Sequence, residues 1–268
     1  MDSFLEVAQE IARETGALLA GYFARRIGYR LKGEFDLVTE ADLASEKLVV
    51  ERLRARFPSH AIVSEEGGGH KGASEYRWFV DPLDGTINFA HGFPVFCVSL
   101  GLERAGELIA GVVYDPMRDE MFSAERGSGA RLNNRRIHVS QASRLADSLL
   151  ATGFPSLKRH LDINVHFFYQ LAMQAHGVRR AGSAALDLAY VASGRLDAFW
   201  EFGLNPWDMA AGALLVTEAG GALTDMHGGP HTLEGPHILA DNGRIHDEAL
   251  QRIREVFAGD YRTPLPTA

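Results

Sequence analysis

Residues 78–86 read Trp78-Phe79-Val80-Asp81-Pro82-Leu83-Asp84-Gly85-Thr86, and this stretch sets the architecture that we expect. An apolar run typical of a buried strand leads into a tight turn that carries two carboxylates. Pro82 fixes its own φ, and Gly85 lets the main chain approach a ligand closely. The amides beyond Gly85 can point at an anion, and a cation between that anion and the carboxylates would reconcile the charges. The stretch indicates a magnesium-dependent phosphoryl-transfer site, although most Asp-Pro and Asp-Gly turns do no chemistry.

The composition is that of an ordinary globular protein, with 268 residues, 46% of them hydrophobic and 23% charged. A chain of this length can bury a substantial core as one large domain or two closely packed halves. The net charge of −8 argues against direct nucleic-acid binding. Cys97 is the only cysteine, which excludes an internal disulfide and fits a reducing compartment. With no membrane-spanning apolar stretch and no signal-peptide pattern, we expect a cytoplasmic protein.

Helical and strand patterns alternate along the chain. Ser3 and Glu6 form a capping-box pattern for a helix expected over residues 3–24. A second helix is expected over 40–56, with Leu43, Val50, Leu53 and Phe57 on one apolar face. Further expected elements are strands at 61–63, 95–102, 111–114 and 121–122, helices at 161–176, 184–193 and 207–219, and strands near 148–152, 197–201 and 221–225. We predict an α/β (α+β) chain with subdomains 1–145 and 146–268 in one compact unit.

Other acids stand at the ends of expected elements. Glu65 and Glu66 follow a strand and precede a glycine-rich turn. Two adjacent glutamates at the end of a strand usually lie on the solvated rim of a protein. Asp208 lies in the first turn of a helix, where an acid stabilises the helix dipole. Asp42 completes a capping-box pattern with Thr39. Each acid alone has a structural interpretation, but a metal needs ligands that converge from separate segments, so their convergence would indicate a site.

Several phosphate and metal chemistries can be excluded by spacing. Asp81 and Asp84 are separated by two residues, which does not fit the D-x-D pattern of phosphatases with an aspartyl-phosphate intermediate. The alternating acids of an EF-hand are absent, and no P-loop pattern occurs. Metal-dependent hydrolysis by an activated water remains.

The chain resembles the inositol monophosphatase family over nearly its whole length. The resemblance rests on residues 36–42 (DLVTEAD), 64–66 (SEE), 78–89 (WFVDPLDGTINF) and 205–212 (NPWDMAAG), which occur in the family's order. Any one segment is a weak match, whereas the joint match is highly specific. The resemblance implies a layered αβαβα sandwich of the inositol monophosphatase and fructose-1,6-bisphosphatase type. It also implies two to three Mg²⁺ ions per site, a homodimer and inhibition by lithium.

The resemblance also implies roles for individual residues. The metal ligands would be Glu65, Asp81, the carbonyl of Leu83, Asp84 and Asp208, a set of oxygens that suits Mg²⁺. Asp42 and Thr86 would orient and deprotonate the attacking water, and Glu66 is a candidate for a catalytic role from behind the metal ligands. The phosphate would lie against the amides of Gly85 and Thr86.

On the substrate side, the resemblance implies a second ligand loop with Arg180 just before it and an acid, Glu201, that bonds substrate hydroxyls. The full set implied for the substrate is Leu83, Asp84, Gly85, Thr86, Arg180, Gly182, Ser183, Ala184, Glu201 and Asp208. Ser183 is equally well explained as a helix N-cap, and Arg180 as one half of a surface ion pair. Lys32 is a further candidate for steering the anionic substrate.

We therefore expect a Mg²⁺-dependent phosphatase that acts on a small phosphorylated polyol, with myo-inositol 1-phosphate first. Fructose 1,6-bisphosphate and histidinol phosphate remain alternatives. A different class of function also remains open, because bacterial relatives of the family are partners of the transcription machinery. The basic pairs Arg135-Arg136 and Arg179-Arg180 could serve an RNA-polymerase-associated binding protein.

Overall fold

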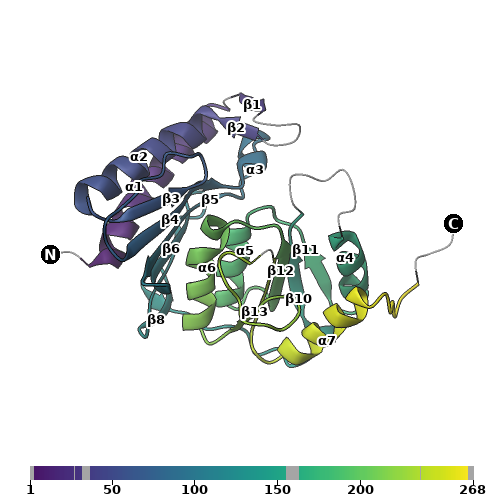
Figure 1. The fold of residues 1–268 in the computed structure, drawn as a ribbon. Helices are drawn as coiled ribbons and strands as arrows, with labels where there is room; N and C mark the ends of the chain where they lie inside the picture. The colour runs from purple at the N-terminus through teal and green to yellow at the C-terminus, as the bar shows by residue number, and fades with distance from the viewer. Residues whose placement is uncertain (1–2, 27, 32–36, 155–162, 236, 265–268) are drawn as a thin grey trace.

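The computed structural model describes residues 3–26, 28–31, 37–154, 163–235 and 237–264. In these ranges, helices and sheets stack in the order αβαβα, as the resemblance implied (Figure 1). No helix in the described ranges has the length and apolarity that a membrane span requires.

Helices α1 (Phe4–Ala24) and α2 (Glu40–Arg56) form the first layer, close to their predicted ranges. Both begin with the predicted capping boxes, in which Ser3 pairs with Glu6 and Thr39 pairs with Asp42. On the predicted apolar face of α2, Val50 and Leu53 are buried, whereas the placement of Leu43 was wrong, because this residue is 56% exposed. The buried face of α2 is offset from Leu43 and includes polar side chains near its N-terminus.

A seven-stranded sheet lies under α1 and α2 (Figure 1). Its strands follow chain order: β3 (Ala61–Ser64), β4 (Tyr76–Asp84), β5 (Cys97–Arg104), β6 (Glu107–Asp115), β7 (Glu120–Glu125), β8 (Gly129–Leu132) and β9 (Arg135–Arg136). β3 and β4 are parallel, and all later neighbours are antiparallel. A small antiparallel pair, β1 (Tyr29–Leu31) and β2 (Leu37–Thr39), leads into α2.

The second sheet has the strand order β11-β10-β12-β14-β13. Its members are β10 (Leu149–Thr152), β11 (Gly177–Arg179), β12 (Ala198–Phe202), β13 (Ala222–Thr224) and β14 (His237–Asp241). α5 (Ala184–Ala192) and α6 (Pro206–Glu218) fill the space between the two sheets and are buried on nearly every side. α4 (Asn164–Ala172) and α7 (His246–Phe257) cover the outer face (Figure 1).

A pair of glycines brings α6 close to the first sheet. Gly101 on β5 and Gly111 on β6 are cross-strand partners. A Cβ at Gly101 would lie 2.6 Å from the Cβ of Ala210, and one at Gly111 would lie 2.9 Å from the carbonyl oxygen of Ala211. Both positions need glycine because the α6 backbone lies directly against the strands.

The two sheets use separate parts of the chain, residues 61–136 and 149–241. The predicted boundary near residue 145 falls between them and stays a prediction. The strand expected at 61–63 and the helix expected at 184–193 agree with β3 and α5 to within one residue.

Candidate active site

The prediction of a tight turn at Asp81 and Asp84 was wrong, because β4 runs through both residues. An irregularity at the end of β4 brings these two acids to the same side of the sheet. Residues three apart on a regular strand face opposite sides. Asp81 pairs with Ser99, but Asp84 pairs with Cys97, so β4 holds one more residue than β5 over this stretch. Such a bulge shifts the alternation by one, which returns Asp84 to the side of Asp81. Pro82 has no backbone N–H to donate to a neighbouring strand. It is tolerated here because the bulge interrupts the regular hydrogen bonding between the strands.

Electrostatics show that acids from separate segments converge on Asp81, which is 2% exposed. Burial raises the pKa of Asp81 well above its ordinary value, and the charges of Glu65, Asp84 and Asp208 raise it further. Its Oδ1 accepts a hydrogen bond from the Leu83 amide at 3.0 Å. These acids belong to β4, to the turn after β3 and to α6, so the structure gathers residues that are far apart in sequence.

Asp84 is held by the N-terminus of α5. Its Oδ2 accepts hydrogen bonds from the Ser183 hydroxyl at 2.6 Å and from the Ala185 amide at 2.8 Å. Burial raises the pKa of Asp84, and these donors oppose the rise. Ser183 also caps α5 by accepting from the Leu186 amide. The Ser183 hydroxyl is therefore directed at Asp84, and its predicted contact with substrate stays a prediction.

Asp208 stands in the first turn of α6 and closes a capping box with Asn205. Its Oδ2 accepts from the Asn205 amide at 2.7 Å. Burial and then the charge of Asp84 raise the pKa of Asp208 to about 7. Asp208 therefore caps α6 and also contributes its charge to the acid cluster.

Asp42 and Thr86 are in direct contact. The Thr86 hydroxyl lies 2.8 Å from Asp42 Oδ1 and 3.2 Å from the Leu83 carbonyl oxygen, so it can donate to either. The other oxygen of Asp42, Oδ2, accepts from the amide and the hydroxyl of Thr39. The start of α2 thus fixes Asp42 against the end of β4 and the start of the helix that follows it.

The turn itself depends on Gly85. Gly85 has a φ of 102°, and a Cβ there would lie 2.9 Å from the carbonyl oxygen of Val95. It precedes the short helix α3 (Thr86–Ala90). Both the dihedral angle and the space exclude other residues, so the main chain passes the site without a side chain in the way.

The second ligand loop is joined to this turn by Asn88, a residue that the sequence analysis missed. The Asn88 Nδ2 donates to the carbonyl of Ala181 at 2.8 Å and contacts that of Gly182 at 3.3 Å. Arg180 is exposed, and its guanidinium lies over Gly182, where a Cβ would be 2.7 Å from Nη1. Its sequence signal was its position inside the segment 78–89, which carries part of the resemblance to the family.

Glu201 lies on β12 and is 8% exposed. Burial raises the pKa of Glu201 well above its ordinary value, the charges of Asp187, Asp208 and Asp84 add to this, and Arg180 opposes it. Ala184 begins α5 and is also buried. Asp187, another residue missed from sequence, is buried with no hydrogen-bond partner at Oδ1 within the described residues.

Glu65 and Glu66 lie in the turn that follows β3. The Glu65 amide donates to the Val80 carbonyl at 3.2 Å, which places Glu65 beside Asp81. Both side chains are partly exposed and have further interactions. Lys32 lies outside the described residues.

The donor set suits a hard cation. In the described part of the chain, no three His, Cys, Asp or Glu side chains are already gathered closely enough to hold one ion. Asp81 and Asp208 instead bond to amides of their own segments. Mg²⁺ keeps several waters and accepts carbonyl ligands, so it does not require a complete cage of carboxylates. Acids whose charges raise the pKa of the buried Asp81 are also an arrangement that a cation would stabilise.

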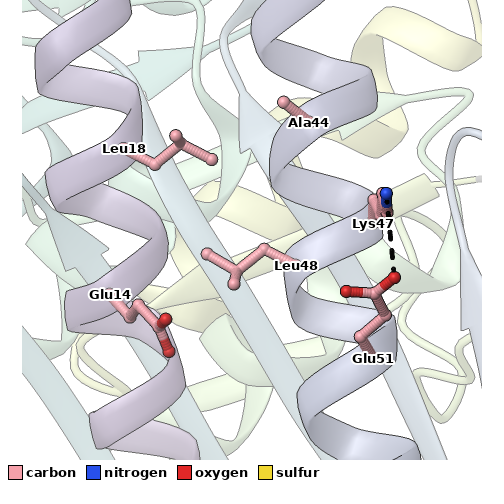
Figure 2. Close-up of a pocket in the computed structure, with 6 residues that line it drawn as sticks. All are labelled: Glu14, Leu18, Ala44, Lys47, Leu48 and Glu51. Carbon is pink, nitrogen blue, oxygen red and sulfur yellow. Dashed lines mark ion pairs between the residues drawn. The ribbon is translucent and has the colours of Figure 1, made fainter.

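A groove of about 500 Å³ lies elsewhere, between α1 and α2, and is lined by Glu14, Leu18, Ala44, Lys47, Leu48 and Glu51 (Figure 2). None of its lining residues belongs to the predicted site. Within Figure 2, Lys47 and Glu51 form an ion pair at 3.9 Å along α2. The groove is therefore a feature of the outer helical layer and not of the acid cluster.

The stacked layers place the protein in the class of layered αβαβα folds. The profile described as "Inositol monophosphatase family" matches residues 1–257. The chain belongs to this family, and this membership supports its assignment as a phosphatase.

Relatives in the family carry two kinds of name. The "Nus factor SuhB" of Pseudomonas aeruginosa is 48% identical over 95% of this chain and 97% of its own. The "Inositol-1-monophosphatase" of Mesorhizobium japonicum is 43% identical over 94% of this chain and 97% of its own. Among solved structures, the inositol monophosphatase from Anabaena has a TM-score of 0.86 and 46% identity, and it covers 94% of this chain and 95% of its own.

Proposed function

We propose that the protein hydrolyses small phosphate monoesters in a Mg²⁺-dependent reaction, with myo-inositol 1-phosphate as the first substrate. The observation that carries the proposal is the convergence of Glu65, Asp84 and Asp208 on the buried Asp81. Acids that surround a buried carboxyl group and oppose its ionisation are costly unless a cation joins them. Membership of the inositol monophosphatase family supports the same reaction class.

Glu65, Asp81, Asp84, Asp208 and the carbonyl of Leu83 would hold two to three Mg²⁺ ions. When bound, Mg²⁺ supplies positive charge that screens the phosphate oxygens and favours ionisation of a nearby water. The protein's own part is to hold these oxygens on stiff backbone: a bulge at β4 for Asp81 and Asp84, and a helix start for Asp208.

Thr86 and Asp42 would direct the attacking water. When the Thr86 hydroxyl donates to Asp42 Oδ1, the shorter of its two contacts, its oxygen lone pairs remain available to accept a hydrogen bond from that water. The proton that the water loses can pass through Thr86 Oγ1 to Asp42 Oδ1. The water oxygen bonds to phosphorus while the ester P–O bond breaks, and the leaving alkoxide takes up a proton to become the alcohol.

On the substrate side, Glu201 would accept hydrogen bonds from hydroxyl groups, and Arg180 would contribute positive charge beside the loop at Gly182. A buried acid that faces the cluster suits a hydroxyl-rich compound, which favours inositol phosphates. Fructose 1,6-bisphosphate and histidinol phosphate are the alternatives on the same scaffold. The predicted role of Glu66 behind the metal ligands remains part of the proposal.

The test is phosphate release with Mg²⁺ and with EDTA from inositol 1-phosphate, fructose 1,6-bisphosphate and histidinol phosphate. Mg²⁺-dependent release that is fastest from inositol 1-phosphate is the expected result. A different preferred compound would replace the substrate and leave the reaction class standing. No release from any compound would overturn the proposal.

A second function is favoured by the names of close relatives, several of which are called Nus factor SuhB. We propose as an alternative that the protein acts as an RNA-polymerase-associated regulator. The test is a pull-down with RNA polymerase at physiological salt, using both the wild type and Asp84→Asn. Retained binding by an inactive Asp84→Asn variant would support the role, whereas no binding by either form would reject it.

The oligomeric state is a separate part of the proposal. We propose a homodimer, and light scattering coupled to size-exclusion chromatography would measure its mass against that of the 29.3 kDa chain. Inhibition of phosphate release by lithium is expected in the same assay. A monomeric mass would reject the proposed homodimer. Phosphate release that lithium does not inhibit would reject the expected lithium sensitivity.

A further inference from the structure

Glu46 lies one helical turn after Asp42, on the same face of α2. Its side chain is buried, with 6% of the residue exposed. Glu46 Oε1 accepts two hydrogen bonds, from the Ser64 hydroxyl at 2.5 Å and from the Gly68 amide at 3.1 Å. A buried carboxylate is costly unless such donors compensate it, so its position on this face calls for an explanation.

The two donors bracket Glu65 and Glu66. Ser64 ends β3, and the Gly67 amide donates back to the Ser64 carbonyl at 3.4 Å. On the other side, the Glu65 amide is bonded to the Val80 carbonyl. The turn is therefore tethered to β4 next to Asp81 and, through Ser64 and Gly68, to α2.

Gly68 provides an independent sign of this tether. A Cβ at Gly68 would lie 2.9 Å from both Cδ and Oε2 of Glu46. The φ of Gly68 is not in the left-handed region, so its own backbone would tolerate alanine. The close approach of the Glu46 carboxylate is what requires glycine here.

We propose that Glu46 is a positioning residue for the metal site, holding the Ser64–Gly68 turn so that Glu65 is presented beside Asp81. The inference rests on the proposed Mg²⁺-dependent function. α2 then links two parts of the site as one rigid rod: Asp42 at its start holds Thr86, and Glu46 one turn later holds the turn that bears Glu65. Glu46 itself acts through hydrogen bonds and touches neither substrate nor metal.

The test compares Glu46→Ala with Glu46→Gln by calorimetric titration of Mg²⁺ into the purified protein. Alanine removes the acceptor, and we expect Mg²⁺ affinity to fall roughly 10- to 100-fold, as for other residues that orient metal ligands. Glutamine keeps an acceptor oxygen in the same place and should restore affinity close to the wild type. Hydrogen exchange without metal should be faster at the amides of the Ser64–Gly68 turn in Glu46→Ala only. Glu51→Ala, an exposed glutamate on the same helix, is the matched control.

A double-mutant cycle with Gly68→Ala sharpens the test. Gly68→Ala alone should weaken Mg²⁺ binding because its methyl group displaces the turn. In the Glu46→Ala background the carboxylate is gone, so Gly68→Ala should add no further loss. If Glu46→Ala does not fold, Ser64→Ala removes one of the two hydrogen bonds and should weaken binding in the same direction.

The outcomes separate the two proposals. Unchanged Mg²⁺ affinity in Glu46→Ala, equal losses in Glu46→Ala and Glu46→Gln, or additive losses in the cycle would each overturn the role of Glu46 and leave the proposed function intact. A wild-type protein that binds no Mg²⁺ would overturn the proposed function and this inference with it.

Discussion

Individual acids of the site also stabilise the backbone next to them through hydrogen bonds. Asp42 and Asp208 complete capping boxes, and Asp81 accepts from an amide two residues on. Helix starts and tight turns have few conformations, so an acid that bonds to its own backbone is also held rigidly toward the site. The structural and the functional interpretation of these residues are therefore not rivals.

Asp208→Asn tests this at the residue scale. Asparagine can still accept from the Asn205 amide, so α6 should keep its cap, while the carboxylate charge is lost. We expect kcat/KM for phosphate release to fall by at least about 100-fold, or about 2.7 kcal/mol of transition-state stabilisation. The thermal stability of the metal-free protein should not fall, because one repelling carboxylate charge is removed. Asp260→Asn, an exposed acid, is the control, and an unfolded Asp208→Asn would mark Asp208 as mainly structural.

The main elements are placed by close approach as much as by hydrophobic pattern. α6 carries Asp208 at its start and lies against β5 and β6 at Gly101 and Gly111. Without Cβ atoms at these positions the helix axis can come near the sheet, which brings Asp208 toward Asp81 on β4. The geometry of the acid cluster thus depends on a packing contact that none of the acids makes.

Gly101→Ala is expected to disturb both stability and activity. The new Cβ would meet the Cβ of Ala210 at 2.6 Å, and relieving such an overlap typically costs about 1–3 kcal/mol. Because the overlap moves α6, phosphate release should also slow. Urea unfolding and initial rates measure the two effects. Gly21→Ala, where nothing lies within 4 Å, is the matched control and should not destabilise.

His246 at the start of α7 provides a pH-dependent contact between elements. Its Nδ1 lies 2.6 Å from Asp241 Oδ2 on β14, and this bond raises the pKa of His246 above its ordinary value. Burial and the charge of Arg254 lower the pKa of His246, and the charge of Asp247 raises it. The Thr224 hydroxyl lies 3.4 Å from Nε2 of His246. A raised folded-state pKa stabilises the fold fully below the unfolded value, and this contribution is lost as the pH rises through the folded value.

The prediction is that His246→Gln destabilises the protein more at about pH 5.5 than at about pH 8.5, either side of the ordinary histidine pKa. The free energy of unfolding in urea, measured at both pH values for wild type and variant, checks it. Taking the difference between the two proteins cancels the titration of other groups. An equal difference at both pH values would contradict a protonated His246 in the native state.

Across the whole molecule, the site joins the two halves of the chain. Asp81 and Asp84 come from the seven-stranded sheet, and Asp208 comes from the helical layer between the sheets. Their mutual repulsion opposes this packing, whereas a cation shared among them would favour it. Metal binding and overall stability are therefore expected to be coupled.

Mg²⁺ at 100 times its dissociation constant should raise the free energy of unfolding by about 2.7 kcal/mol for one site. Thermal or urea unfolding with Mg²⁺ and with EDTA measures this shift. Asp84→Asn should reduce the shift, because the two halves would share fewer charges with the ion. A shift of the same size in Asp84→Asn would show that Mg²⁺ stabilises the protein elsewhere.

Local signals in the sequence determined much of this protein. The capping boxes at Ser3 and Thr39 and the alternation of elements depend on neighbouring residues only, so they can be predicted from the order of residues along the chain. The turn expected to carry Asp81 and Asp84 was wrong, because pairing with β5 extends β4 to Asp84. The resemblance to the family in four segments supplied the layered fold, which the structure confirms. The placement of Leu43 failed because a helix face is set by what packs against it.

Tertiary structure alone decided which acids meet and what holds them. The bulge that turns Asp84 toward Asp81 is a mismatch between two strands, and the tether from Glu46 to Ser64 joins residues 18 positions apart. Asn88 and Asp187 gain their surroundings from segments near residues 181 and 201. Contacts of this kind depend on the packing of whole elements, and composition, periodicity and spacing carry no record of them.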